Sequence, residues 1–409
     1  MTEFYDDLET RDRETREEAQ FSALPAFIEN TKNEAPGWAA HLEGVDPAAV
    51  TSREALASLP VLRKSDLSEL QTANPPFGGF ASNTVGSYGR LLMSPGPIFE
   101  PEGRGDDRWH SARAFFAAGF RPGDIIHNCF SYHLSPGAFL MEAGARMLGC
   151  AVVPAGVGNT EMQIEAISSL KPTGYTGTPD YLKVLLDAAS EAGKDASSIT
   201  RALVSGGALF PAMRDEYRER GVAVLQCYAI AELGLVAYES EAVEGMIVEE
   251  EIIVEIVRPG TGDRVADGEV GEVIVTTFNP DYPMIRLATG DLSAVMEGAS
   301  PCGRTNMRIK GWMGRADQAA KMKGMFIRPE QVAEIAKRHP ELGRVRLEIS
   351  RDAAQDVMIL KAECSEANDA FAGKIANTLQ SVTKMKGEVE LVPLGTLPND
   401  GLMIADLRD

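Results

Sequence analysis

A regular alternation of short apolar segments with helical segments between residues 125 and 226 most constrains how this chain can fold. The apolar segments are predicted as strands at residues 125–129, 151–154, 174–177, 202–205 and 223–226. The segments between them are predicted as helices near residues 137–148, from about 160, over about 179–192 and near 211–219. Strands that alternate with helices form a parallel sheet with helices on its faces. We therefore predict an α/β fold with mostly parallel strands.

The rest of the chain is predicted to add smaller parts to this sheet. Residues 1–70 are interpreted as helical and peripheral, with a charged helical surface over residues 10–18. Residues 90–101 suggest a short strand and then a Pro/Gly loop. Antiparallel strands from 245 to 277 indicate a small β subdomain at about 240–300, in which the acidic run 249–251 is expected to be solvated. Residues after about 317 read as a small α/β unit that ends in a loop.

Length, charge and cysteine content limit the class of protein. The 409 residues exceed one ordinary core, so two or more domains are expected. The formal net charge of −20 argues against nucleic acid or an anionic membrane as a partner. The acidic start and the absence of any run of 18 apolar residues predict a cytoplasmic protein without a transmembrane helix. The five cysteines are scattered without a C-x-x-C pair, so they indicate core packing for most of them.

Two neighbouring strand ends carry the residues best suited to a ligand site. The fourth predicted strand runs into a turn with paired glycines, Gly206 and Gly207, which let a ligand approach the backbone closely. The fifth runs into a turn with an aromatic face, Tyr228, and a carboxylate, Glu232. Ligands of open α/β sheets bind at the carboxyl ends of strands. These residues could hold a flat heterocycle, with Glu232 facing a metal, and two ordinary core strands with turns are the alternative.

Two further motifs follow later in the chain. Asp291 ends the segment 282–291 on a predicted turn, where its carboxylate suits the hydroxyls of a ribose diol. Gly314-Arg-Ala-Asp317 lies at the predicted domain junction. Together with Tyr228-Ala-Ile-Ala-Glu232, these motifs resemble those of adenylate-forming enzymes, and the chain as a whole looks like the phenylacetate–coenzyme A ligase group. The resemblance runs nearly end to end, at residues 5–11, 59–66, 75–80, 123–128, 160–164, 178–181, 228–232 and 290–291.

The resemblance implies a fold and a reaction. The fold would be a large N-terminal domain, residues 1–316, that includes the β subdomain, and a small mobile C-terminal α/β domain, residues 317–409. The reaction would be an ATP-dependent, AMP-forming ligation. A carboxylic acid, often an aryl acid, attacks the α-phosphorus of MgATP to give an acyl-adenylate and pyrophosphate. The small domain then rotates, and coenzyme A displaces AMP.

The resemblance also implies roles for individual residues. Those implied for nucleotide binding are Ser205, Gly206, Gly207, Ala208, Tyr228, Ala229 and Asp291. Glu232 would ligate Mg²⁺, Arg315 would assist at the ribose, and Asp317 would be the hinge. Those implied for an aromatic acyl pocket are Phe130, Tyr132 and His133. For His133, a structural role in the core or a loop is an equally good interpretation.

The phosphate loop departs from the family pattern. The family loop is rich in Ser, Thr and Gly and ends in Gly-Lys-Pro, whose amides and lysine hold the triphosphate. The nearest candidate here is Met93-Ser-Pro-Gly-Pro-Ile-Phe-Glu100, which has no lysine. Its two prolines have no N–H to donate, and Glu100 would repel phosphate. Only Ser94 and Gly96 resemble residues of a phosphate cradle.

The C-terminal loop departs as well. Leu402 stands where such ligases present a lysine that reaches the carboxylate and the α-phosphate during adenylation. A cation aimed at developing negative charge typically lowers a barrier by several kcal/mol, which leucine cannot do. Possible substitutes are Lys321, Lys323 and Lys386, and the spacing favours none of them.

Some relatives carry a structural metal site of Cys and His near the β subdomain. The matching positions here are Tyr238, Ser240, Ile247, Ser300 and Cys302, so only one thiol is retained. We therefore predict that this chain binds no zinc.

Two hypotheses of different classes follow for the function. The first is an acyl- or aryl-CoA ligase that is slow in its first half-reaction, which the retained Tyr228, Glu232 and Asp291 favour. The second is a reduced-activity or non-catalytic relative that binds nucleotide, acyl-adenylate or acyl thioester, which the phosphate loop and Leu402 favour. A Rossmann dehydrogenase fits poorly, because no G-x-G-x-x-G follows an early strand. The acid, the acceptor thiol and the oligomeric state stay open, with a homodimer as one alternative.

Overall fold

The computed structural model describes residues 3–316, 320–322, 325–352, 355–365, 367–398 and 400–408. The chain divides into two compact units. The first comprises Met1–Val254, Val275–Leu287 and Met296–Gly311, and the second comprises Glu255–Ile274, Ala288–Val295 and Trp312–Asp409. Residues 317–319, including the proposed hinge Asp317, lie outside the described residues. The domain boundary at residue 316 therefore stays a prediction.

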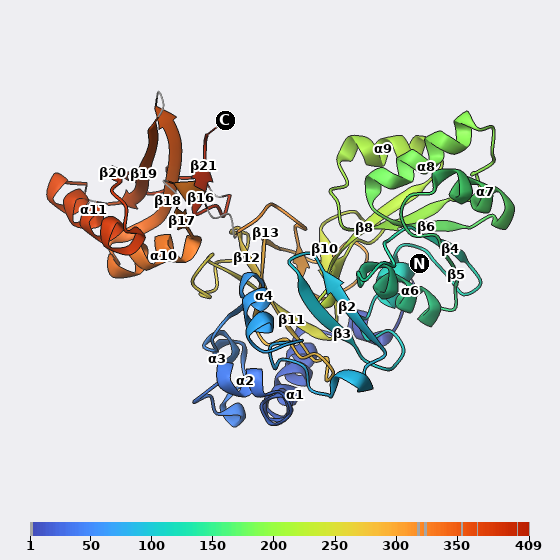
Figure 1. Cartoon of the computed structure of the whole chain (residues 1–409), viewed down its shortest axis with the longest axis horizontal. Coiled ribbons are helices and arrows are strands. Elements are labelled where there is room, and N and C mark those ends of the chain that lie inside the picture. The colour runs from blue at the N-terminus through green and yellow to red at the C-terminus, as the bar shows by residue number, and fades with distance from the viewer. Residues whose placement is uncertain are drawn as a thin grey trace. The chain divides into compact units, whose positions relative to one another are not determined.

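The predicted parallel sheet is confirmed and makes up half of a nine-stranded sheet in the order β14-β15-β10-β9-β8-β7-β6-β4-β5. Strands β4, β5, β6, β8 and β10 of this sheet are labelled in Figure 1. Its parallel strands are β4 (Ile125–Asn128), β5 (Ala151–Pro154), β6 (Gly174–Gly177), β7 (Arg201–Val204) and β8 (Ala223–Ile230). The helices between them are α6 (Gly137–Met147), α7 (Thr160–Leu170), α8 (Pro179–Glu191) and α9 (Pro211–Glu219). Each of these elements begins within one or two residues of its prediction, because the period of apolar residues fixes local structure.

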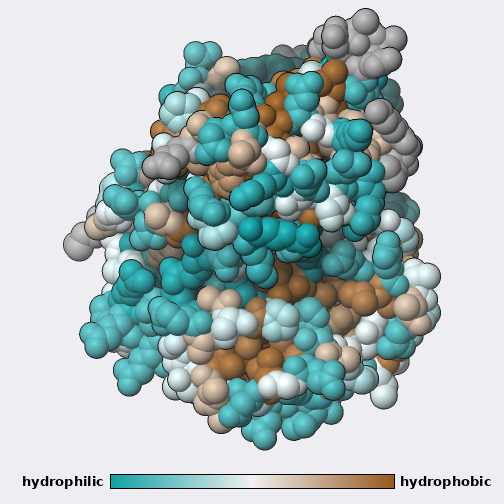
Figure 2. Space-filling model, turned by 90° about the vertical axis from the view of Figure 1, so that its left-hand side faces the viewer, coloured by the Kyte–Doolittle hydropathy of each residue, from teal (hydrophilic) through white to brown (hydrophobic). Residues whose placement is uncertain are grey.

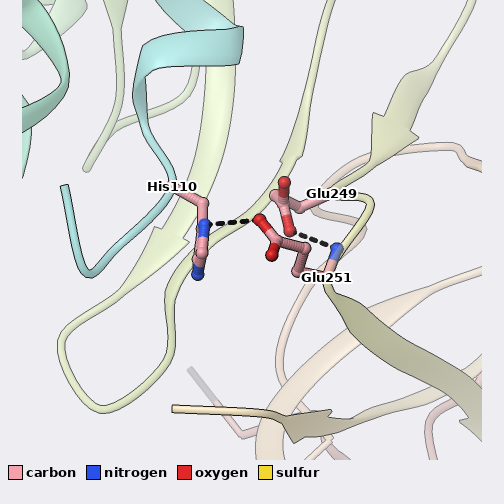
Figure 3. A group of neighbouring side chains, drawn as sticks. All are labelled: His110, Glu249 and Glu251. Atoms are coloured by element: carbon pink, nitrogen blue, oxygen red, sulfur yellow. Dashed lines mark hydrogen bonds and ion pairs between the residues drawn. The ribbon is translucent and has the colours of Figure 1, made fainter. Parts of the chain in front are cut away.

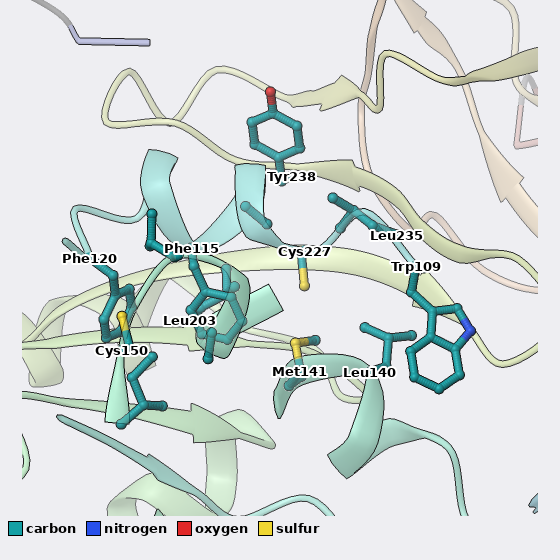
Figure 4. Packing of buried hydrophobic residues seen from close by; sticks show 14 of the residues in the cluster. Trp109, Phe115, Phe120, Leu140, Met141, Cys150, Leu203, Cys227, Leu235 and Tyr238 are labelled. Carbon is teal, nitrogen blue, oxygen red and sulfur yellow. The ribbon is translucent and has the colours of Figure 1, made fainter. Parts of the chain in front are cut away.

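Helices cover both faces of this parallel half. Leu203 packs on one face with residues of α5 (Ala112–Ala117) and α6. Its neighbour Val204 packs on the other face with residues of α7, α8 and α9, because successive strand residues point to opposite faces. Figure 4 shows the first of these cores, in which Phe115 and Phe120 lie edge to face with ring centroids 5.3 Å apart. All five cysteines are free and buried, as the sequence predicted for most of them.

The other half of the sheet is antiparallel and corrects the prediction for Tyr228. Strand β8 does not turn there but continues to Ile230, because it pairs with β9 (Gly234–Tyr238), in which Ala237 lies opposite Tyr228. The turn follows at residues 231–233. It ends at Gly234, whose φ is +80° and at which a Cβ would lie 2.8 Å from the Cα of Trp109. The sheet continues through β10 (Met246–Val248), β15 (Arg308–Ile309) and β14 (Val295–Met296).

The N-terminal segment is helical, as predicted, but it is not merely peripheral. Its elements are η1 (Asp7–Thr10), α1 (Arg13–Glu34), α2 (Pro36–His41), η2 (Pro47–Ala49), α3 (Arg53–Ala57), α4 (Lys64–Ala73) and η3 (Val85–Ser87). Arg16 of α1 is buried, and its Nε lies 2.8 Å from Glu250 Oε2. The expectation that residues 249–251 are solvated is therefore wrong for Glu249 and Glu250, which are both buried. Buried carboxylates persist only when they are paired, and Arg16 and Arg113 supply the partners.

Residues 90–101 form a hairpin and not a strand with a loop. Strands β2 (Arg90–Ser94) and β3 (Ile98–Glu102) pair antiparallel, and Ser94 lies opposite Ile98. Residues 95–97 make the turn between them. A separate four-stranded sheet has the order β1-β13-β12-β11. Its strands are β1 (Leu62–Arg63), β11 (Ile252–Val257), β12 (Gly271–Thr277) and β13 (Leu287–Ser293).

The C-terminal part of the second unit is the predicted small α/β fold. Its sheet has the order β20-β19-β18-β21. The elements are β16 (Ala320–Met322), β17 (Met325–Ile327), α10 (Pro329–Arg338), β18 (Leu342–Asp352), β19 (Gln355–Cys364), α11 (Asp369–Thr383), β20 (Glu388–Val392) and β21 (Ile404–Asp406). Strands β18 and β19 form the predicted hairpin. The predicted final loop is wrong for β21, which pairs in parallel with β18 and joins one apolar core with α10 and α11.

Over the described ranges, no helix combines the length and the apolar composition that a membrane crossing needs. Figure 2 shows one face of the molecule, on which hydrophilic residues dominate and hydrophobic residues emerge in patches between them. Exposed apolar residues are normal on folded proteins, and these patches by themselves assign no partner.

Candidate functional site

The glycine turn follows β7 and lies at the carboxyl end of the parallel strands. Ser205 is buried, and its hydroxyl donates to the carbonyl of Cys227 at 2.8 Å, which ties the turn to β8. Gly206 has a φ of +71°, a conformation that a side chain would disfavour. A Cβ at Gly206 would also lie 3.6 Å from Cε1 of Phe130. Gly207 and Ala208 are exposed, so the backbone of this turn is open to a ligand.

Strand β8 brings the predicted adenine residues beside this turn. Val204 lies opposite Gln226 in the parallel register, and the hydroxyl of Ser205 reaches the carbonyl of Cys227, so the turn begins beside the part of β8 that leads into Tyr228. Tyr228 and Ala229 are half-buried, and the pairing with β9 shifts register between them. Such a bulge re-aims side chains at the edge of a site. The structure thus ties Ser205 to the residue before Tyr228, although Tyr228 lies on a strand and not on the predicted turn.

Of the three predicted acyl-pocket residues, two are half-buried and one is exposed. Phe130 is half-buried and faces the glycine turn. Tyr132 is also half-buried, and its hydroxyl donates to Glu142 Oε2 at 2.8 Å while its ring lies edge to face with Phe139. His133 is exposed, and its backbone N–H donates to the hydroxyl of Ser131 at 3.2 Å. The position of Phe130 agrees best with a contact to a flat acid beside the glycine turn.

Glu232 is a buried carboxylate with a partner that sequence reasoning missed. Its side chain is completely buried, and Lys64 Nζ lies 2.8 Å from Oε2. The other oxygen, Oε1, is buried and has no hydrogen-bond partner among the described residues. An orphan carboxylate oxygen fits a divalent cation, because Mg²⁺ prefers carboxylate and phosphate oxygens as ligands. Lys64 is 168 residues distant in sequence and begins α4, so no local signal pointed to it.

The hairpin β2–β3 carries a second buried carboxyl group. Glu100 accepts a hydrogen bond from the backbone N–H of Ser94 at 3.1 Å and another from the Ser94 hydroxyl. Both residues are buried. Burial, together with the negative charge of Glu232, raises the pKa of Glu100 to about 8, although Ser94 and Lys64 act in the opposite direction. Glu100 therefore holds a proton at neutral pH.

The second unit contains the predicted ribose residues. Asp291 is buried in strand β13, so the prediction of a turn there is wrong. The strand persists because Leu287–Ser293 is a member of the four-stranded sheet. Arg315 Nη1 donates to Asp291 Oδ1 at 3.0 Å, and Trp312 Nε1 donates to the same oxygen at 3.1 Å. Trp312 is 57% exposed and was not singled out in the sequence, since only folding places it beside Asp291.

Leu402, in the same unit, is half-buried and packs against an apolar cluster of Val270, Leu292, Ala294 and Ala316. Its backbone N–H donates to Asp400 at 3.1 Å. Of the lysines considered as substitutes, Lys323 and the side chain of Lys321 lie outside the described residues.

The positions of the structural metal site in some relatives are occupied by a hydrogen-bonded cluster. Ser300 Oγ and Cys302 Sγ lie 3.1 Å apart, and Arg304 Nη1 donates to the same sulfur at 3.6 Å. Burial would raise the pKa of Cys302, but hydrogen bonds from Ser240, Ser300 and Arg304 lower it. The hydroxyl of Tyr238 instead contacts Glu9 at 2.7 Å. The absence of zinc stays a prediction.

A different group of side chains has metal-ligand chemistry. Candidate ligand atoms of His110, Glu249 and Glu251 lie within 4.8 Å of one another (Figure 3). His110 Nδ1 lies 2.8 Å from Glu251 Oε2, and Arg113 contacts both carboxylates. Burial opposes the charged imidazole, but the hydrogen bond to Glu251 and the charge of Glu249 raise the pKa of His110 to about 9. His110 and Arg113 therefore already pair with the two carboxylates that a metal would need.

Comparisons with known proteins identify the family of this chain. The sequence model of the AMP-binding enzyme family matches residues 109–279. A phenylacetate–coenzyme A ligase of Thermus thermophilus is 30% identical over 88% of this chain and 84% of its own length. One of Aromatoleum evansii is 32% identical over 80% of this chain and 76% of its own length.

A solved structure supports the same assignment at the level of the fold. A 2-hydroxyisobutyryl-CoA ligase in the postadenylation state, in complex with an acyl-AMP, superimposes with a TM-score of 0.72 and 27% identity, over 98% of this chain and 91% of that chain. The same ligase was solved with 2-HIB-AMP and CoA, with a TM-score of 0.71.

The relatives and the fold therefore place this chain among the adenylate-forming enzymes. The chain belongs to the phenylacetate–coenzyme A ligase family of AMP-forming CoA ligases. These comparisons confirm the predicted family resemblance and the α/β fold class. The ligands of this family are ATP or AMP and coenzyme A.

Proposed function

We propose that this chain converts a small carboxylic acid, with an aryl acid favoured, to its coenzyme A thioester through an acyl-adenylate. The observation that carries the proposal is the pairing of β7 with β8 and the Ser205–Cys227 hydrogen bond, which bring the open glycine turn to the part of β8 that leads into Tyr228, while Phe130 lies near Gly206. A flat adenine would stack on Tyr228 beside Ala229, and the turn residues Ser205 to Ala208 would line the adenylate. Phe130 and Tyr132 support an aryl acid, because aromatic walls suit flat apolar ligands. His133, which is exposed, fits an edge of this pocket at most.

In this proposal the charged residues bind the metal ion and the ribose and form the hinge. Glu232 would ligate Mg²⁺, which neutralises phosphate charge in the first half-reaction. Lys64 pairs with Glu232 and would hold its carboxylate in place. Asp291, held by Arg315 and Trp312, would accept hydrogen bonds from the ribose hydroxyls. The hinge role of Asp317 remains a proposal on a residue outside the described ranges.

We also propose that adenylation is the slower half-reaction. In that step a carboxylate oxygen attacks the α-phosphorus and pyrophosphate leaves. Leu402 offers no charge to this step, and the turn of the β2–β3 hairpin contains Pro95 and Pro97, which lack an N–H. In the second step the thiol sulfur of coenzyme A attacks the acyl carbonyl and AMP leaves. That step has no triphosphate to hold, so neither departure affects it.

Synthetic phenylacetyl-adenylate offered with coenzyme A tests this proposal. The chain should form the thioester and release AMP, which mass spectrometry detects. A carrier-protein thiol is the alternative acceptor, and a phosphopantetheinylated carrier offered in place of coenzyme A distinguishes the two. Tyr228→Ala should reduce the rate by at least about tenfold. No thioester from either acceptor would reject the ligase proposal.

The second candidate function is the non-catalytic relative, which Leu402 and the Ser94–Glu100 contact favour. Such a protein would gain thermal stability with AMP or the adenylate but would release no AMP from the adenylate on addition of a thiol. A homodimer and a cytoplasmic location are further proposals. Light scattering after size-exclusion chromatography measures the first, and cell fractionation the second.

A further inference from the structure

In the candidate phosphate loop, residues 93–100, the hydrogen-bond donors of Ser94 already bind another residue of the protein. Ser94 is the residue of this loop best suited to hold a phosphate, because it offers both a backbone N–H and a hydroxyl. The N–H donates to Glu100 Oε2 at 3.1 Å, and the hydroxyl donates to Glu100 Oε1. A carboxyl group presents two oxygens to these donors much as two oxygens of a phosphate would. The carboxyl group of Glu100 therefore uses both Ser94 donors that a phosphate would need.

The hairpin fixes this contact. Ser94 lies opposite Ile98, and Glu100 lies opposite Leu92, so the two strands hold Ser94 and Glu100 on the same face. Ser94 is 7% exposed and Glu100 is 2% exposed. The intervening turn adds little donor capacity, because Pro95 and Pro97 have no N–H. A phosphate could reach Ser94 only if Glu100 gave up two buried hydrogen bonds, which costs free energy unless both groups find new partners.

The surrounding charges also disfavour binding of a triphosphate near Ser94. Lys64 is paired with Glu232, so this cation is already matched by a carboxylate. Burial and the negative charge of Glu232 both raise the pKa of Glu100. The β- and γ-phosphates of ATP would add roughly three negative charges near the Glu232 carboxylate, and like charges disfavour each other at buried sites. AMP and acyl-adenylates lack these phosphates and need no donor from Ser94.

We propose that Glu100 is a specificity-determining residue that makes the nucleotide site select adenosine monophosphate esters, namely AMP and acyl-adenylates, over ATP. The inference rests on the proposed function, because it needs an adenylate site at Tyr228 and the glycine turn. It adds a cause within this chain for slow adenylation that is independent of Leu402. The acyl-adenylate is then the substrate that the site holds best.

Isothermal titration of the full chain with AMP and with MgATP at pH 7 tests the proposal. The parent should bind ATP at least about tenfold more weakly than AMP. Glu100→Ala frees both donors of Ser94 and removes a carboxyl group, so its Kd for ATP should fall by about tenfold or more. The Kd for AMP should stay within about twofold, because AMP does not reach the hairpin.

Glu102→Gln is the matched control. Glu102 lies two residues along the same strand, faces the same side and is also buried, but its carboxylate accepts from Arg90 at 2.7 Å. This control should leave the ratio of the two Kd values unchanged. If Glu100→Ala does not fold, Ser94→Ala tests the same contact. Because Ser94 serves Glu100 and not ATP in the parent, its loss should change the Kd for ATP by less than about twofold.

Each result decides the proposal. Equal affinity of the parent for AMP and ATP would overturn the role of Glu100 and leave the nucleotide site intact. An equal gain in ATP affinity for Glu100→Ala and Glu102→Gln would overturn it too, since the loss of either buried carboxyl group of the hairpin would then suffice. A fivefold weaker affinity of Ser94→Ala for ATP would show that Ser94 reaches the triphosphate. Absence of AMP binding to the parent would reject the proposed function itself, and this inference with it.

Discussion

Replacing Lys64 by methionine should destabilise the protein, because it leaves the carboxylate of Glu232 buried without its cation. The ammonium lies 2.8 Å from Glu232 Oε2, the Glu232 side chain is completely buried, and Oε1 has no hydrogen-bond partner among the described residues. Breaking a buried ion pair from one side costs about 3–5 kcal/mol. Lys64 is 25% exposed, so water screens part of the interaction, and the lower end, about 3 kcal/mol, is expected.

This free energy corresponds to a measurable change in Tm. For a domain of about 150–250 residues, 1 kcal/mol shifts Tm by roughly 2–4 °C, so Lys64→Met should lower it by about 6–12 °C. Circular dichroism at pH 7 measures the transition. The double variant Lys64→Met/Glu232→Gln should regain most of the loss, because replacing both partners removes the uncompensated charge.

Lys183→Met provides a control on the surface. Lys183 is 40% exposed and pairs with Glu216 and Asp187, so its loss should change Tm little. The reasoning fails if Lys64→Met melts like Lys183→Met. It also fails if the double variant is no more stable than Lys64→Met, since the burial of the Glu232 charge would then not be the cause.

Three further predictions concern the nucleotide site, adenylation and pH. Asp291→Ala removes the acceptor shared by Arg315 and Trp312, so the affinity for AMP in calorimetry should fall by about tenfold or more with the fold intact, and an unchanged Kd would reject the ribose assignment. Leu402→Lys should raise acid-dependent exchange of labelled pyrophosphate into ATP by about tenfold if the ammonium supplies roughly 1.4 kcal/mol, whereas exchange at ordinary ligase rates in the parent would contradict the argument. The folded-state pKa of His110, raised to about 9, exceeds its unfolded value of about 6.5, so the stability that His110 contributes is full below pH 6.5 and is lost as pH rises through 9. The Tm difference between the parent and His110→Gln should therefore shrink between pH 6 and pH 10, and a constant difference would refute the assigned pairing with Glu251.

Much of the fold could be predicted because its signals are local. The periods of apolar residues in 125–226 distinguish strand from helix within a few residues, and the parallel order follows from their alternation. The paired glycines predicted the turn after β7, and Gly206 has the positive φ that only glycine adopts readily. Tyr228, Glu232 and Asp291 were found through their motifs, and their assigned roles remain predictions.

The sequence could not decide which groups meet across long separations. Strand β8 passes Tyr228 because β9 offers it a partner, and an isolated strand gives no sign of where its partner ends. Glu249 and Glu250 look solvated as an acidic run, and only Arg113 and Arg16, more than 100 residues away in the chain, make their burial possible. The contacts of Lys64 with Glu232 and of Trp312 with Asp291 likewise join residues far apart in the sequence. Local propensity acts over a few residues, whereas the pairing of buried charges depends on which distant segments pack together, and only the tertiary structure decides that.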